Sequence, residues 1–332
     1  GATEGLSVTT LAGADATALE PWRALLAREY ASIDTAFARL NTALAIDGPM
    51  VRVAPGARID APVHLVFVGA GSGFAWNARA LVEIGADASA RIVCHHVGGD
   101  AAGQFGNLVV QGALGARSRL DVTDVQDADP DATLIRRSEF ALADEATLSS
   151  QVLELGARLA RHDLGIDLRG RGARFVSRGV FALRGRQHAD THLDIRHEAR
   201  DTASDVLWRG VADGRSRGVF HGAITVAAGA DGADASLSNK NLLLSPHAEI
   251  DTQPVLEIHA DEVKAAHGAT VGQLDERALF YLRSRGLPVD AARRLLIAAF
   301  AAAALADVSP APFREQLERL VASRLPRDEA AS

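Results

Sequence analysis

The sequence predicts a mainly β protein. Its core, residues 49–272, is a right-handed parallel β-helix, with an N-terminal helical arm (1–48) before it and a C-terminal helical domain (273–332) after it. Short alternating apolar runs, such as VHLVFV, RIVCHHV and DVLWRGV, follow one another from about residue 50. The turns between these runs resemble one another, and aromatic residues make up only 5% of the chain, which suits a narrow aliphatic core.

The turns provide the strongest signal for a repeat. PGARID, IGADASA, LGARSRL, RGARFVS and GADASLS each place a Gly-Ala pair before a polar residue and then resume the β alternation. A short unit that recurs in this way predicts coils stacked along an axis, each burying its apolar residues against the next. The spacing of the repeats is irregular, so a β-sandwich remains the second possibility.

Helical periodicity marks both ends of the chain. Residues 21–44 place apolar side chains at steps of three, four and seven, which predicts one amphipathic helix with Pro21 in its first turn. From Asp275 the segments DERALFYLRSRGLP, DAARRLLIAAFAAAALADV and PAPFREQLERLVASRL predict three more helices. The apolar run Leu295–Ala306 is shorter than the roughly 20 residues that span a bilayer, so we expect it to be buried against protein.

Composition excludes several function classes. A formal net charge of −7 disfavours a general nucleic-acid or acidic-membrane surface. The only lysines, Lys240 and Lys264, lie outside any Gly-Lys-Ser/Thr sequence, which excludes a Walker A loop. Cys94 is the only cysteine, so one chain cannot form a disulfide or a four-thiolate cluster, and a reducing, cytoplasmic location is expected. The segment GATEGLSVTT lacks the basic region and apolar core of a signal peptide.

Two glycine-containing motifs resemble catalytic or nucleotide-binding loops. GRSRG (214–218) matches the Gly-x-Ser-x-Gly pattern of a nucleophile elbow, but the strand-like VFHGAITV follows it where a helix is required, so we predict a turn. VGAGSG (68–73) follows a strand without opening an amphipathic helix, which disfavours dinucleotide binding.

The histidines allow a search for metal ligands. In RIVCHHV, Cys94 and His96 share one face of a strand and His95 faces the other way. These are too few ligands for a closed site, so we predict a buried cysteine with a solvent-facing histidine. His188 and His192 also share a face, but we find no carboxylate cluster at a recognisable offset and interpret them as surface histidines.

Residues 238–287, SNKNLLLSPHAEIDTQPVLEIHADEVKAAHGATVGQLDERALFYLRSRGL, closely resemble the C-terminal signature of the SufB/SufD family, the scaffold proteins of the SUF iron–sulfur assembly system. The match is nearer to the SufD branch. The order of arm, β core and helical tail extends the resemblance over most of the chain, with a shorter N-terminal helical region than is usual. The resemblance implies a SufD-like, non-catalytic scaffold that supports cluster assembly and iron acquisition.

The resemblance also implies a partner and a site. SufD-like proteins pair with SufB through their β-helix cores, and the histidine of the HGATVG stretch, here His267, is implicated in forming the nascent cluster at that interface. Related sequences can carry a cysteine two residues earlier, where this chain has Ala265. SufB is therefore expected to supply the sulfur ligands of a transient shared cluster, and no cofactor is expected in the isolated chain.

A second partner is implied for the C-terminal helices. Family members bind the ATPase SufC there, and closure of SufC on nucleotide binding would be transmitted to the interface around His267. Isolated chains are expected to form homodimers through the same β-helix edge. The candidate docking residues are Arg283, Arg285, Leu295, Leu296 and Phe300.

Three alternatives stay open. His267 would otherwise be a polar residue that ties the last coil to the first C-terminal helix, and the apolar helices would otherwise pack only on each other. The chain would alternatively be a β-helix enzyme that acts on polysaccharides, which needs clustered acids and aromatic platforms. Trp76 and Trp208 are the only tryptophans of the predicted core, and we find no close acid pair.

Overall fold

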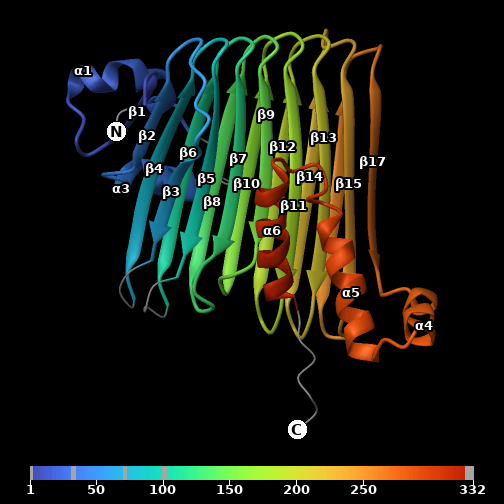
Figure 1. The fold of residues 1–332 in the computed structure, drawn as a ribbon. Helices are drawn as coiled ribbons and strands as arrows, with labels where there is room; N and C mark the ends of the chain where they lie inside the picture. The colour runs from blue at the N-terminus through green and yellow to red at the C-terminus, as the bar shows by residue number, and fades with distance from the viewer. Residues whose placement is uncertain (1–2, 31–34, 70–72, 99–102, 326–332) are drawn as a thin grey trace.

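The computed structural model describes residues 3–30, 35–69, 73–98 and 103–325. From β2 onward the described strands alternate between two sheets, and every neighbouring pair within a sheet is parallel. The chain therefore winds as a parallel β-solenoid with helices at both ends, which confirms the predicted class (Figure 1). None of the described helices is both long enough and apolar enough to span a lipid bilayer.

One described sheet has nine strands and the other has eight. In spatial order the first contains β1 (Leu6–Thr10), β2 (Pro49–Val53), β4 (Ala75–Ile84), β6 (Phe105–Leu114), β8 (Thr133–Leu142), β10 (Leu159–Leu168), β12 (His188–His197), β14 (Arg217–Val226) and β16 (Glu249–Ile258). The second contains β3 (Val63–Val68), β5 (Ser89–Val97), β7 (Arg119–Asp127), β9 (Thr147–Glu154), β11 (Arg174–Leu183), β13 (Ala203–Ala212), β15 (Asp234–Leu243) and β17 (Lys264–Gly272).

The Gly-Ala turns close the coils as the repeat predicts. Asp87 and Arg117 follow such pairs and adopt left-handed backbone, with φ of 59° and 57°. A Cβ on Gly115 would come within 2.7 Å of the backbone nitrogen of Ala86 in the neighbouring turn, so the stacked turns require glycine there. Paired strands lie 26 residues apart at Thr133 and Leu159 but 32 apart at Arg217 and Glu249. Coil length varies, and this explains the irregular repeat.

The interior between the two sheets holds a large apolar core. Alternate residues of each strand face inward, so valine, leucine, isoleucine and alanine side chains stack along the axis. A few large aromatic side chains also fill this core: Trp208, Phe181 and Phe220 are completely buried. The two sheets are thereby held as one rigid body on which surface side chains keep fixed spacings.

The N-terminal segment differs from the prediction. It begins with a strand, β1, which pairs antiparallel with β2, and sequence reasoning missed it. The single helix predicted over 21–44 is wrong: the described chain forms α1 (Ala16–Leu19), a 3₁₀ turn (Glu20–Trp22), α2 (Arg23–Leu26) and α3 (Ala36–Leu44). Residues 27–30 are not helical, and 31–34 lie outside the described residues. The chain buries Trp22 and Tyr30 at separate places on the first sheet instead.

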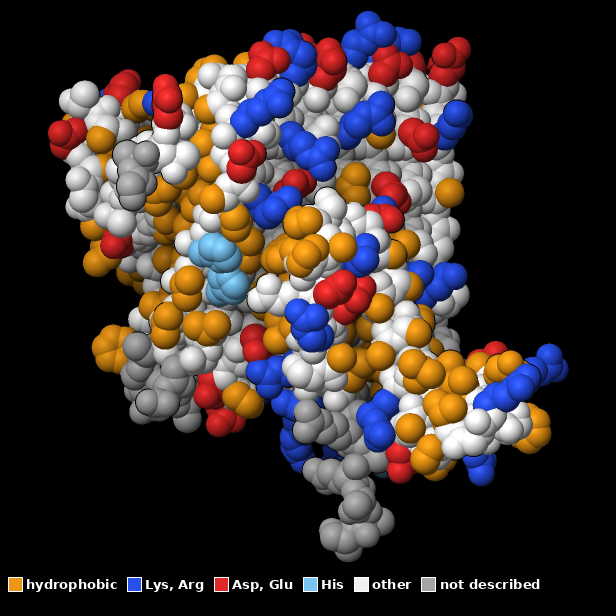
Figure 2. Space-filling view, in the orientation of Figure 1, with side chains coloured by type: hydrophobic (Ala, Val, Ile, Leu, Met, Phe, Trp, Pro, Cys, Tyr) orange, Lys and Arg blue, Asp and Glu red, His pale blue; other side chains and the backbone are white. Residues whose placement is uncertain are grey.

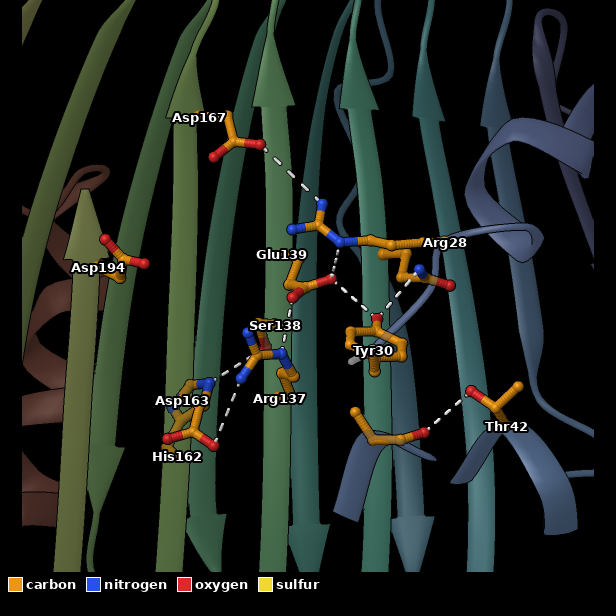
Figure 3. A network of polar contacts seen from close by, with 12 residues as sticks. Arg28, Tyr30, Thr42, Arg137, Ser138, Glu139, His162, Asp163, Asp167 and Asp194 are labelled. Carbon is orange, nitrogen blue, oxygen red and sulfur yellow. Dashed lines mark hydrogen bonds and ion pairs between the residues drawn. The ribbon is translucent and has the colours of Figure 1, made fainter. Parts of the chain in front are cut away.

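A polar network fastens this segment to the first sheet (Figure 3). The Tyr30 hydroxyl donates to Glu139 over 2.8 Å, and the Arg28 guanidinium lies 2.9 Å from the same carboxylate. Arg137 contacts Glu139 at 2.7 Å and extends the network to Asp163 at 3.7 Å. Burial, aided by the Glu139 charge, raises the pKa of Tyr30, so the phenol stays a proton donor.

The three predicted C-terminal helices are present as α4 (Glu276–Ser284), α5 (Val289–Ala302) and α6 (Ala311–Arg324). Asp275 caps α4 by accepting from the backbone nitrogen of Arg277 over 2.8 Å. Helices α5 and α6 pack on the outer face of the eight-stranded sheet, where Ile297 and Val321 join the side chains of β9, β11 and β13 in one cluster (Figure 1). The apolar run from Leu295 is thus partly buried within the chain.

Candidate functional site

The solenoid is open at its C-terminal end. β16 and β17 are the last described strands of their sheets, so each has a strand on one side only. Their side chains are far more exposed than those of the central strands: Ile250 is the only buried residue of β16, and β17 has none. Ile258 and Val271 are 42% and 41% exposed. An edge with unpaired backbone groups and uncovered apolar side chains is suited to pairing with another chain.

His267 lies on this open end. It pairs in register with Leu237 of β15, a buried core residue, so it occupies the inward-facing row of the last coil. No further coil covers it among the described residues, and His267 is therefore exposed. Its side chain makes no hydrogen bond or ion pair within the described part of the chain, α4 included. Ala265, in the same row, is partly buried against the core.

The five residues predicted for docking are spread over two helices. Arg283 and Arg285 lie at the end of α4, where the Arg285 guanidinium stacks on the Tyr281 ring at 5.2 Å. Leu295 is 49% exposed on α5, whereas Phe300 turns toward the sheet and lies under Arg209 of β13. Leu296 is half-buried. These five side chains therefore do not form one continuous patch.

Leu295 lines a groove between α5 and α6. The groove has a volume of about 490 Å³ and an apolar floor that includes Ala298, Ala302 and Val321. Glu315, Glu318 and Arg319 of α6 also line it, which gives it a charged side. A second hollow, of about 550 Å³, lies between the exposed Phe280 of α4 and Val289 at the start of α5.

A buried ionic cluster lies inside the solenoid and was missed in the sequence. Arg136 of β8, 1% exposed, contacts both Asp124 and Glu154. His96 Nε2 lies 3.2 Å from Asp124, and His162 Nδ1 lies 3.6 Å from Glu154. The signal was present in TLIRRSEF, because strict alternation places Arg136 in the inward row with Leu134 and Phe140.

Charges in this cluster determine its protonation. Burial alone would raise the pKa of Asp124, but the Arg136 guanidinium and His96 outweigh it and hold that pKa well below its usual range. Burial lowers the pKa of His96, so this imidazole stays neutral at pH 7. Cys94 is buried beside the cluster, and burial together with the Asp124 charge raises the pKa of its thiol. The cysteine is therefore a protonated core residue, and its predicted burial is confirmed.

The described residues contain no group of three or more His, Cys, Asp or Glu side chains arranged to hold a metal ion. On β12, His188 and His192 do share the outer face, and the sequence reading overlooked Asp190 between them, whose carboxylate lies 2.8 Å from His192 Nε2. The His192 ring also lies 5.2 Å from that of His221 on β14.

The two glycine motifs do not form catalytic loops in the described chain. In GRSRG, Gly214 has φ of 68°, and the Ser216 hydroxyl is buried and accepts from the Asp213 backbone nitrogen over 3.1 Å. The motif leads into β14, which confirms the predicted turn. VGAGSG connects β3 to β4, both strands, and its residues 70–72 lie outside the described residues.

Comparison with known proteins agrees with this architecture. Residues 67–300 match the family model described as "SUF system FeS cluster assembly, SufBD core domain". The chain is 30% identical over 294 residues to the iron–sulfur cluster assembly protein SufD of Escherichia coli K12, covering 87% of this chain and 70% of that protein. It is also 30% identical over 298 residues to a SufBD family protein of Synechocystis, covering 87% and 66%. The chain belongs to the SufB/SufD family of iron–sulfur cluster assembly proteins and is SufD-like.

Proposed function

We propose that this chain is a non-catalytic scaffold subunit of a cytoplasmic SUF complex, which pairs with a SufB-type protein through its open solenoid end. The single observation that supports this most strongly is the exposure of β16 and β17. A partner β-helix placed there would continue both sheets and cover Ile258 and Val271. In the absence of that partner, the same edge pairs with a second copy of the chain.

His267 is positioned for a role at this interface. A neutral imidazole is a good ligand for iron, and an exposed side chain in the inward row of the last coil would face the partner's first coil. Related sequences can carry a cysteine two residues before this histidine, but this chain has Ala265 there and so offers no thiolate beside His267. The partner therefore provides the sulfur ligands of a transient cluster. In this arrangement the chain supports cluster assembly and iron acquisition without forming or breaking covalent bonds itself.

The groove between α5 and α6 is the proposed docking site for the SufC ATPase. Its apolar floor and charged side fit an amphipathic partner surface, and Leu295 is exposed beside it. Because α5 and α6 also pack on β9, β11 and β13, a SufC movement that shifts these helices is transmitted to the solenoid. This is the physical route by which nucleotide binding would act on the open end.

The polysaccharide-active alternative gains no support from the outer sheet faces. Acidic residues that would be its catalytic candidates are engaged with arginine: Asp163 and Asp190 both contact Arg161, and Asp251 contacts Arg217 at 2.6 Å. Burial would raise the pKa of Asp190, but the contacts with His192 and Arg161 outweigh it and lower that pKa, so this carboxyl is ionised, which is the wrong state for a general acid.

The two interfaces can be tested separately. Val271→Lys places a charge on the open edge, and we expect it to weaken binding to purified SufB by at least about tenfold, or 1.4 kcal/mol, in biolayer interferometry. Val68→Lys is the matched control, since Val68 is 57% exposed at the far end of the solenoid. Leu295→Glu should reduce SufC binding and leave SufB binding unchanged. Equal SufB affinities for the two lysine variants would contradict the proposed edge.

A further inference from the structure

Two histidines face each other on the outer surface of the eight-stranded sheet, at the opposite end from His267. His64 of β3 pairs with Val93 of β5, so His95, two residues further along β5, lies diagonally across on the same face. His64 Nδ1 and His95 Nε2 are 3.0 Å apart. The ring centroids are 5.2 Å apart and the ring planes differ by 16°, so the two nitrogens lie on the near edges of the rings.

The two rings can change tautomer, and one combination of tautomers lets both facing nitrogens bind a ligand. Neither His64 Nε2 nor His95 Nδ1 has a described hydrogen-bond partner, so neither ring is fixed in one tautomer by its second nitrogen. Without an ion, one ring donates an N–H hydrogen bond to the facing nitrogen of the other ring over this distance. When each ring instead carries its proton on its outer nitrogen, two lone pairs face each other and can share a metal cation.

The spacing suits a metal ion. Two imidazole nitrogens at about 2.05 Å from one ion are about 2.9 Å apart at a 90° angle and about 3.35 Å apart at a tetrahedral angle. The observed 3.0 Å lies between these values. His64 is exposed, so rotation of its ring to direct the lone pair at the ion displaces no core side chain.

The surroundings strengthen such a contact. Val66 and Val68, each 57% exposed, lie on the same face of β3, and the histidine patch is bordered by hydrophobic side chains on this face of the molecule (Figure 2). The cation on the same face of β5, Arg91, is engaged with Asp121 and with the Ser309 carbonyl. An apolar border lowers the local dielectric constant and so raises the interaction of the imidazoles with an ion.

We propose that His64 and His95 form a two-imidazole site for a borderline divalent transition-metal ion, whose remaining coordination positions are filled by water. Two ligands make an open, exchangeable site rather than a closed structural one. Affinity follows the order Cu²⁺ above Ni²⁺ and Zn²⁺, then Fe²⁺ and Mn²⁺, and Mg²⁺ does not bind because it prefers oxygen ligands. This site does not depend on the proposed SufB and SufC interactions.

The test is calorimetric titration of the untagged, full chain with Ni²⁺, Zn²⁺ and Mg²⁺ at pH 7.5. We expect His64→Ala and His95→Ala each to lower Ni²⁺ affinity by more than about tenfold, since even an outer-shell partner of a metal ligand is worth that much. The matched control is His221→Ala, which disrupts the other adjacent-strand pair, with His192. It should leave the affinity within about twofold.

A second readout separates coordination from a structural role. On addition of Zn²⁺, imidazole ¹⁵N spectra should show shifts of Nδ1 of His64 and Nε2 of His95, with an unchanged thermal midpoint for both alanine variants. Equal Ni²⁺ affinities for wild type, His64→Ala and His95→Ala would overturn the proposal, and so would a loss confined to His221→Ala.

Discussion

Arg136→Leu removes the only cation of the buried ionic cluster described inside the solenoid. Its guanidinium is 1% exposed and contacts Asp124 and Glu154, whose side chains are 9% and 2% exposed. The variant leaves two carboxylates in a core that water does not reach. Breaking a buried ion pair from one side costs about 3–5 kcal/mol. That is a large part of the roughly 5–15 kcal/mol that keeps a typical domain folded.

The loss of folding stability in Arg136→Leu should depend on pH. Without Arg136, burial dominates and raises the pKa of both carboxyls above their unfolded values, so the variant regains stability as the pH falls and they take up protons. Urea unfolding at pH 7 and pH 5, followed by circular dichroism, measures both effects. Adding Asp124→Asn and Glu154→Gln to the variant removes the buried charge and should restore more than half of the loss.

Arg117→Leu is the control for this prediction. Arg117 and Asp87 also form an ion pair, at 2.7 Å, but both side chains are more than half exposed on neighbouring turns. Exposed pairs contribute little to stability, so this variant should unfold close to wild type. A loss of stability in Arg136→Leu no larger than in Arg117→Leu, or a loss that is the same at pH 5 and pH 7, would contradict a stabilising role of the buried cluster.

Three further predictions concern other parts of the chain. Burial lowers the pKa of His197 to about 4, so the unfolded chain takes up a proton before the folded one as the pH drops; stability should fall by up to about 3 kcal/mol between pH 6.5 and 4. His197→Asn should flatten this slope in urea titrations. Gly179→Ala drives a Cβ to within 2.2 Å of the Trp208 indole and should cost about 1–3 kcal/mol, whereas Gly268→Ala, with open space around it, should be neutral in thermal melts. His267→Ala should leave the melting midpoint unchanged but reduce cluster formation when assayed with SufB and SufC; normal cluster yield would contradict its role.

The solenoid could be predicted because its signal is local and repeated. Each Gly-Ala turn, such as that before Asp87 or Arg117, predicts the same backbone conformation. The alternation of apolar and polar residues between turns then determines which side chains face inward. The three C-terminal helices carried start and stop signals of their own, including Asp275 and Gly286. These features need no knowledge of which strands are neighbours.

The missed features depend on contacts between distant residues. The helix predicted over 21–44 is interrupted because Tyr30 reaches Glu139, 109 residues away, and no periodicity encodes that contact. His64 and His95 are 31 residues apart and meet only because the β3–β5 register brings them together. Coil lengths vary, so this register could not be counted from the sequence.

If the open end of the solenoid and the C-terminal helices make this chain a subunit of a larger SUF assembly, as proposed above, the chain should form a complex with SufB and SufC. The most direct test is light scattering coupled to size-exclusion chromatography, on the purified chain alone and mixed with SufB and SufC at micromolar concentrations. We expect one species whose mass contains this chain, SufB and SufC, and its loss with Val271→Lys but not with Val68→Lys. Separate elution of the wild-type chain from both proteins would contradict the account.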